Sequence, residues 1–343
     1  MKLRERIEIL TNMPGLSAAE DTVAQYLTES LALLGIPADI DRFGNVHGRI
    51  ESSAPEAKTI LLEAHMDQIG LMISGVDDQG YLKFVSLGGV DERILCGMEV
   101  KILTDPPVYG VIGAYRPEPE KDKEPKAAKL EELRIDAGLS PEDAGRLIPP
   151  GTGVFMDAKT VTLLGGKMSG SAMDNRAGMA AILDCLSRIA GKSLPYHIEI
   201  LFSTQEELGL HGAYTGIAPG MADAAIVVDV THGTTPDSKD ATGVFPLGCG
   251  AVICRGPNLH YENTRQLIAL AKEMHVSHEI EVASGGSGTT AWAIQTIGSG
   301  IPVMLVSIPL RYMHTNVETL EPADIQAVSD LLTEAVTGGI NLA

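Results

Sequence analysis

The sequence predicts an α/β fold with a β-rich segment inserted into it, and three observations support this prediction. The chain has 343 residues, a length that suits two domains of roughly 150 residues each. Helical patterns alternate with short apolar runs in the first quarter and in the second half of the chain. Between them, from about residue 70 to residue 165, short strand-like pieces are separated by Gly, Pro and Asp turns. We therefore expect a helix-and-sheet domain that is interrupted by a small β-rich domain.

The first predicted helix begins at a capping box. In the segment SAAE at residues 17–20, the Ser17 hydroxyl can accept from the Glu20 N–H while the Glu20 side chain reaches back. The apolar residues that follow have helical spacing: Val23, Tyr26, Leu27, Leu31 and Leu34. Gly35 and Pro37 end the pattern, because glycine suits the left-handed end of a helix and proline cannot continue one.

Three further helices and four buried strands are predicted downstream. The helices are expected at Asn175–Ile189, Thr264–His275 and Pro322–Val336. The strands are expected at Thr59–Ala64, His197–Ser203, Ala224–Val230 and Val303–Ile308. Helices that alternate with apolar strands are typical of a mainly parallel sheet, because parallel strands need helical crossovers and are buried on both faces.

The segment between Gly70 and Gly165 has a different pattern of predicted secondary structure. Four short strand-like pieces occur in it: Leu71–Ser74, Tyr81–Val85, Glu99–Leu103 and Val108–Gly113. Such spacing is typical of a small β-barrel or β-sandwich. The stretch Arg116–Glu132 is dense in Lys, Glu and Pro and is expected to be a solvated loop.

The composition excludes several classes of protein. The 45 Asp and Glu residues outnumber the 26 Lys and Arg residues and give a net charge of −19, which argues against nucleic acid or an anionic membrane as partner. The N-terminus lacks a signal-peptide core, and the longest apolar run, Ile301–Leu310, is half of the ~20 residues of a membrane span. The four cysteines form no CxxC pair and are expected to be reduced thiols. We expect a soluble, cytoplasmic protein.

Metal-capable side chains lie at or just after the end of each of the four predicted strands. They are His65 and Asp67 after the first strand, Glu206 and Glu207 after the second, Asp229 in the third, and His314 after the fourth. A further acid, Asp174, stands at the start of a predicted helix. Because ligands bind beyond the carboxyl ends of the strands in an open α/β sheet, we expect these side chains at one edge. The seven other histidines lack this placement and are expected to be structural or peripheral.

The charges of this set favour a metal centre. Five carboxylates in one crevice repel each other unless they are protonated or neutralised, and two divalent cations would neutralise them. Imidazole and carboxylate ligands together suit Zn, Co or Mn. Each residue alone has an ordinary explanation: a surface histidine, a helix-capping Asp174, or a solvated turn at Glu206 and Glu207. Their joint occurrence at successive strand ends is the argument for two metal ions.

Motifs of other enzymes are absent or weak. The sequence has no GxSxG, HExxH or GxxxxGK[ST] motif. Residues 286–291 fit the dinucleotide pattern GxGxxA, but they lie late in the chain and no acid follows at about 20 positions. Glu206 and Glu207 are adjacent, so they do not suit a glycosidase pair, which needs a separation of roughly 5–9.5 Å across the sugar.

Five motifs together resemble the M42 family of metallo-aminopeptidases, the group of glutamyl, leucyl and tetrahedral aminopeptidases. They are AHMDQIG at 64–70, MDNRAG at 173–178, QEELG at 205–209, VDVTH at 228–232 and PLRYMHT at 309–315. The resemblance implies a three-layer α/β/α catalytic domain, similar to zinc peptidases, formed by residues 1–69 and 165–343. It also implies a PDZ-like β-barrel, inserted at residues 70–164, that serves dimerisation and assembly.

The resemblance also implies a role for each site residue. Asp174 would bridge two metal ions, with His65, Asp229, Glu207 and His314 as the other ligands. Glu206 would be the general base that takes a proton from the metal-bound water, and Asp67 would orient the ligands. The free α-amino group of a short peptide would bind the second metal. The family forms homo-oligomers, typically dodecamers built from dimers.

Two questions stay open at the level of the sequence. Related sheets host other hydrolases, so the rival functions are a metal-dependent deacylase, a glucan hydrolase and an assembled protein without turnover. The chain also departs from the family pattern at Thr290, where an Asp is common. If that loop lies near the substrate, the loss of an acid would disfavour basic first residues.

Overall fold

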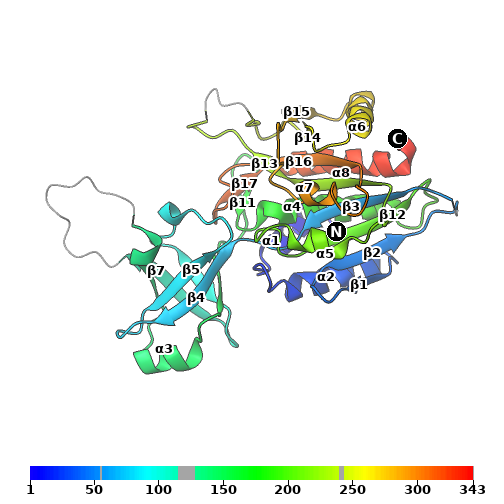
Figure 1. The fold of residues 1–343 in the computed structure, drawn as a ribbon. Helices are drawn as coiled ribbons and strands as arrows, with labels where there is room; N and C mark the ends of the chain where they lie inside the picture. Colours follow the sequence, from blue (N-terminus) through cyan, green and yellow to red (C-terminus); the bar gives the residue numbers. More distant parts are fainter. Residues whose placement is uncertain (55, 115–127, 239–242, 343) are drawn as a thin grey trace.

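The computed structural model describes residues 1–54, 56–114, 128–238 and 243–342, and its centre is an eight-stranded sheet (Figure 1). The strand order is β1-β2-β12-β3-β13-β16-β14-β15. In this order the strands span Ala38–Ile40, Val46–Ile50, His197–Ser203, Thr59–His65, Ala224–His232, Val303–Leu310, Ala251–Arg255 and His278–Val282. The central strands β12, β3, β13 and β16 run parallel to one another, which confirms the prediction of a mainly parallel sheet. All four predicted strands are present and begin at the predicted residues.

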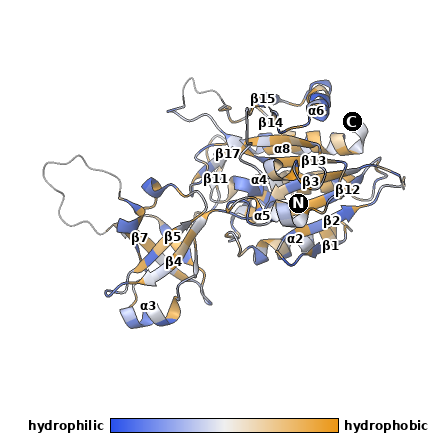
Figure 2. Cartoon of the chain, viewed as in Figure 1, coloured by the Kyte–Doolittle hydropathy of each residue, from blue (hydrophilic) through white to orange (hydrophobic). Residues whose placement is uncertain are grey.

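Helices cover both faces of this sheet and make it the middle of three layers. These α-helices are α1 (Leu3–Thr11), α2 (Asp21–Leu33), α4 (Met173–Ile189), α5 (His211–Gly216), α6 (Tyr261–Glu273), α7 (Ala291–Ile294) and α8 (Pro322–Glu334), whereas α3 (Pro141–Leu147) packs in the inserted β-rich segment. Strand β3 shows the arrangement: Ile60 and Leu62 pack into a core with α1, α2, α4, α6 and α8, and Leu61 packs with α5 and α7. Buried strands therefore carry apolar residues at nearly every position. Figure 2 shows these central strands as hydrophobic and the outer face of α6 as hydrophilic.

The predicted capping box at the start of α2 is wrong. Helix α2 begins at Asp21, and the Ser17 hydroxyl donates instead to Asp67 Oδ2 at 2.6 Å. Glu20 accepts from the N–H groups of Ala18 and Gln205, at 3.1 Å each, so it ties the turn to another part of the chain. A buried carboxylate is a strong acceptor for the Ser17 hydroxyl, and the capping box does not form because the helix begins only after Glu20.

The segment after β3 forms a closed six-stranded barrel that projects from the α/β part (Figure 1). Its strands, in barrel order, are β4 (Gly70–Val76), β5 (Leu82–Leu87), β8 (Leu133–Asp136), β7 (Val108–Ala114), β6 (Glu99–Ile102) and β9 (Gly153–Phe155). The barrel has a hydrophobic core of its own, which includes Leu71, Leu82 and Ile135. A β-rich segment with a separate core therefore interrupts the α/β fold, and the domain limits at residues 70 and 164 stay a prediction.

A small sheet lies where the chain returns from the barrel. Its strands are β10 (Val161–Thr162), β11 (Met168–Gly170) and β17 (Glu318–Leu320), with β11 in the middle. Short turns of 3₁₀ helix lie at Glu92–Ile94 and Leu130–Glu132, and a π-helical turn at Ala335–Gly339 follows α8. Of the predicted loop at Arg116–Glu132, residues 116–127 lie outside the described residues. Among the described helices, none is both long and apolar enough to cross a membrane.

Candidate metal centre

The parallel strands bring the predicted site residues to one edge of the sheet. His65 is the last residue of β3, and it pairs with Ser203 at the end of β12, just before Glu206 and Glu207. Val227 of β13 pairs with Glu63 of β3, so Asp229 lies level with His65 on the neighbouring strand. The shared register thus places the side chains together, as the sequence predicted.

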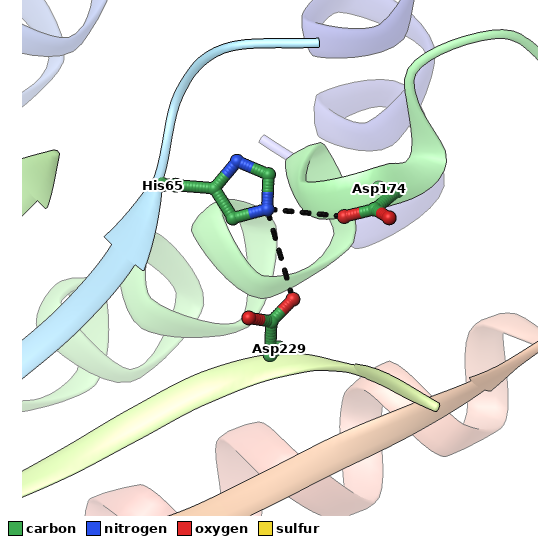
Figure 3. Close-up of side chains that lie close together, drawn as sticks. All are labelled: His65, Asp174 and Asp229. Carbon is green, nitrogen blue, oxygen red and sulfur yellow. Dashed lines mark hydrogen bonds and ion pairs between the residues drawn. The ribbon is translucent and has the colours of Figure 1, made fainter. Parts of the chain in front are cut away.

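The first group of candidate ligands is His65, Asp174 and Asp229 (Figure 3). His65 Nε2 lies 3.0 Å from Asp174 Oδ1 and 3.7 Å from Asp229 Oδ1. All three side chains are buried. Asp174 reaches the group from the first turn of α4, while the other two residues come from neighbouring strands. We call this group the first triad.

The second group, which we call the second triad, is Asp174, Glu207 and His314. His314 Nε2 lies 3.6 Å from Asp174 Oδ2 and 3.5 Å from Glu207 Oε2. The other ring nitrogen, His314 Nδ1, lies 3.0 Å from the carbonyl oxygen of Gly89, a residue of the barrel segment. Asp174 is therefore a member of both triads, with Oδ1 facing His65 and Oδ2 facing His314.

Each triad offers three ligand atoms that lie within 4.8 Å of one another. The donors are one imidazole nitrogen and two carboxylate oxygens in each case, a set that suits zinc, cobalt or manganese. No Lys or Arg lines the cavity among the residues that the structure describes. The described wall supplies no permanent positive charge to these carboxylates, so the donor set fits two divalent cations.

Protons partly balance the charge of the metal-free centre. Burial raises the pKa of Glu206 to about 9 and the pKa of Glu207 to about 8, and neighbouring carboxylates add to both shifts. The hydrogen bond to Asp174 raises the pKa of His314 to about 9. Burial works against a charged Asp174, but His314 and His65 outweigh it and hold its pKa well below the usual range. Protons on His314, Glu206 and Glu207 therefore offset part of the negative charge of the metal-free centre at neutral pH.

Glu206 and Asp67 lie beside the triads and belong to neither. Glu206 lines the same cavity as the ligands. The buried Asp67 carboxylate accepts the N–H of Glu206 at 2.8 Å and the N–H of Glu207 at 3.1 Å, and its Oδ1 lies 3.4 Å from His65 Nδ1. Asp67 thus fixes the backbone of the two glutamates and the ring of a histidine at once.

Sequence reasoning missed two buried glutamates near the centre. Glu318 accepts the backbone N–H of Asp174 at 3.1 Å and that of His314 at 2.9 Å, so it links two members of the second triad. Glu63 accepts from the Ser203 hydroxyl at 2.6 Å and from the Thr290 hydroxyl. An acid within the apolar run of β3 was a signal for Glu63, whereas nothing in the sequence distinguishes Glu318 from the surface acids.

The loop that contains Thr290 lines the cavity through Ser287, Gly288 and Thr289, but Thr290 itself lies behind this wall. Its side chain is 1% exposed, its hydroxyl bonds Glu63, and it is not among the residues that line the cavity. Position 290 is not part of the cavity wall. The presence of Thr instead of Asp there therefore does not change the charge of that wall.

A cavity of about 500 Å³ opens in front of both triads. It is lined by the five ligands and Glu206, and by His232, Glu281, Ser287 and Leu305, among others. This volume is typical of a small-molecule site. His232, which we expected to be structural or peripheral, lies on this wall outside both triads.

The sequence profile of the M42 glutamyl aminopeptidase family matches residues 44–331. The chain belongs to the M42 family. The solved structure of an aminopeptidase from the archaeon Desulfurococcus kamchatkensis has a TM-score of 0.91 and 30% identity, over 98% of this chain and 94% of the other. The TET1 peptidase of Pyrococcus horikoshii, described as able to assemble into a tetrahedron or a large octahedral shell, has a TM-score of 0.86 and 27% identity, over 98% of this chain and 100% of the other.

Among curated proteins, the lysyl aminopeptidase of Pyrococcus furiosus is 28% identical over 330 residues, which are 94% of this chain and 93% of that protein. M42 proteins are metal-dependent aminopeptidases, and this M42 chain is a hydrolase that acts on peptide bonds. The predicted family, and the predicted α/β fold with an inserted barrel, are confirmed.

Proposed function

We propose that the chain removes the first residue of short peptides with two divalent metal ions, one held by each triad. Zn²⁺ is the ion we favour, and Co²⁺ and Mn²⁺ are the alternatives. The observation that carries this proposal is the position of Asp174, whose Oδ1 faces His65 and whose Oδ2 faces His314. One carboxylate with an oxygen toward each of two ligand groups is what a bridging ligand requires.

Two divalent ions, if held by the triads, would supply a Lewis acid for the scissile carbonyl and lower the pKa of a water molecule. Glu206 is free of both triads, so its carboxylate takes a proton from the attacking water and passes it to the leaving amine. Asp67 acts as a positioning residue, because it holds the N–H groups of Glu206 and Glu207. The surrounding carboxylates attract a cationic α-amino group, which would restrict cleavage to the first residue.

The variant Glu206→Gln tests this assignment. It keeps the shape of the side chain and removes the base, so kcat for leucine p-nitroanilide should fall by about 10²- to 10⁴-fold. Metal content, measured by mass spectrometry, should stay at two ions per chain. Glu279→Gln, at an exposed acid of β15, is the matched control and should keep the wild-type kcat. A Glu206→Gln protein with near-native turnover would exclude Glu206 as the base.

A substrate panel separates the rival hydrolases. We expect the metal-loaded protein to cleave aminoacyl p-nitroanilides and to leave N-acyl amino acids and cellulosic glucans intact. Turnover of an N-acyl amino acid or a glucan alone would favour a deacylase or a glucan hydrolase. Absence of turnover on the whole panel would favour an assembled protein without activity.

We also propose that the chain forms a dodecamer from dimers in the cytoplasm. The support is the TET1 peptidase, which assembles into a large shell and matches this chain over nearly its whole length. The four cysteines are all free, as expected in a reducing compartment. Light scattering coupled to size exclusion, with and without a chelator, tests the assembly. A monomer under both conditions would contradict it.

A further inference from the structure

One acid on the cavity wall belongs to neither triad and is not the proposed base. Glu281 lies on β15, an edge strand of the large sheet, and its half-buried side chain lines the cavity. The Thr231 hydroxyl donates to Glu281 Oε1 at 3.0 Å. This hydrogen bond holds the carboxylate of an outer strand against the wall formed by β13.

The Thr231 bond also determines how far Glu281 lies from the metal centre. Thr231 follows Asp229 by two residues on β13, so the two side chains share one face of the sheet, roughly 7 Å apart along the strand. A lysine side chain extends roughly 6 Å from its Cα to its terminal nitrogen. A peptide whose first carbonyl lies at the triads can therefore place a long cationic side chain beside Glu281.

Glu281 has no cationic partner of its own in the described part of the chain. Among the described residues, no salt bridge joins Glu281 to a Lys or Arg, and His232 is the one basic side chain of the cavity wall outside the triads. Burial raises the pKa of the Glu281 carboxyl, and the Thr231 hydrogen bond and the nearby His232 oppose that shift. A ligand with a positive charge beside Glu281 would stabilise the ionised carboxylate and offset the cost of its burial.

The rest of the wall suits the aliphatic stem of such a side chain. Leu305 and Met313 offer apolar surface, and Ser287 and Thr289 offer hydroxyl groups. Lys and Arg stems pack well on apolar surface while their charged heads pair with a polar group. A carboxylate without a Lys or Arg partner, on a wall that also offers the apolar surface of Leu305 and Met313, fits a basic residue better than an acidic or a short apolar one.

We propose that Glu281 selects peptides whose first residue is basic, lysine above all, by pairing its carboxylate with the side-chain cation. This inference rests on the proposed function and names the substrate class of the same site. The sequence led us to expect that basic first residues are disfavoured, because Thr290 replaces an acid. The present inference is the opposite, because the acid that would pair with the substrate lies on β15 and not in the loop after it.

The test compares lysine with norleucine, which has the same carbon chain without the ammonium group. The wild-type protein should cleave lysine p-nitroanilide with a higher kcat/KM than norleucine p-nitroanilide. Glu281→Gln should lower the ratio of the two kcat/KM values by about 10- to 100-fold, the size expected for a hydrogen bond to a charged group. Thr231→Val, which only releases the carboxylate, should lower the ratio less. Glu279→Gln, on the same strand, should leave it unchanged.

Binding provides a readout without turnover. Calorimetric titration should show that L-lysine binds the wild-type protein more tightly than L-norleucine, and that Glu281→Gln removes the difference. An unchanged lysine-to-norleucine ratio in Glu281→Gln would overturn the inference. An equal loss on both substrates would also overturn it, because Glu281 would then hold the α-amino group that all peptides share. If no aminoacyl substrate is cleaved, the proposed function fails, and the lysine titration still decides the role of Glu281.

Discussion

The two triads share Asp174 and differ in how the chain holds their other members. His65 and Asp229 extend from neighbouring strands of the central sheet, and their side chains are 2% and 6% exposed. His314 lies in the segment after β16, has a side chain that is 34% exposed, and is held through its ring by the Gly89 carbonyl of the barrel segment. One triad is therefore part of the core, and the other depends on contact between two parts of the molecule.

This difference predicts which of the two ions the chain binds more tightly. Groups on packed strands are kept in place by the sheet and its two hydrophobic cores, whereas a half-exposed loop opens at lower cost. We expect the ion of the first triad to bind more tightly and that of the second to exchange with solvent. The experiments below test this asymmetry, from the largest expected effect to the smallest.

Asp174→Asn should have the largest effect, since it changes the residue common to both triads. The amide keeps the shape of the side chain but loses the negative charge that both ions need. We expect neither ion to be retained after gel filtration and kcat to fall by roughly 10³-fold or more. Metal analysis and a thermal melt of the same sample check this, because a folded variant that retains two ions would show that Asp174 does not bridge.

His314→Ala and His65→Ala should separate the triads. Loss of His314 should leave about one ion per chain, because the first triad stays complete. Loss of His65 removes a buried ligand at the core, so it should lower both metal content and the melting temperature of the metal-loaded protein. Equal metal content in the two variants would argue that the triads do not differ in strength.

Metal binding should release protons, because two ligands of the second triad, Glu207 and His314, are protonated in the metal-free protein at pH 7. The pKa of His314 is about 9 and that of Glu207 about 8, so both must lose a proton before they coordinate. Affinity at the second triad should therefore rise with pH between 7 and 9, by up to about tenfold per unit for each proton. Calorimetry in buffers of different ionisation enthalpy measures the proton count, and a count of zero would contradict the shifts.

Ser17→Ala should have the smallest effect and act on the surroundings of the first triad. It removes the 2.6 Å hydrogen bond to Asp67, so the free energy of unfolding should fall by about 1–3 kcal/mol and kcat by only a few-fold. Ser53→Ala, at an exposed serine pair, is the matched control. If Ser17 acted as a helix cap, its effect on stability would be the same in an Asp67→Asn background; coupling between the two changes is what we expect.

Much of the fold could be predicted because it depends on local pattern. The apolar runs of β3, β12, β13 and β16 begin where the sequence placed them, since a buried parallel strand needs apolar residues at nearly every position. The site followed from the same reasoning, because parallel strands end at one edge and carry their terminal side chains there. Helix α1 was not predicted, and the limits of α6 were shifted by a few residues, because helix ends depend on packing as well as on propensity.

The sequence by itself determined the type of the main elements and the chemistry at the strand ends, because both depend on residues that are close in the chain. Only the tertiary structure decided the partners of the polar side chains. Ser17 bonds Asp67 across 50 positions and Asp174 bonds Glu318 across 144. Glu281 reaches the cavity because β15 is hydrogen-bonded to β14 in the same sheet. These pairings join residues that are far apart in the sequence, so the tertiary fold determines them. A buried polar group forms its hydrogen bonds with the partners that the fold places next to it.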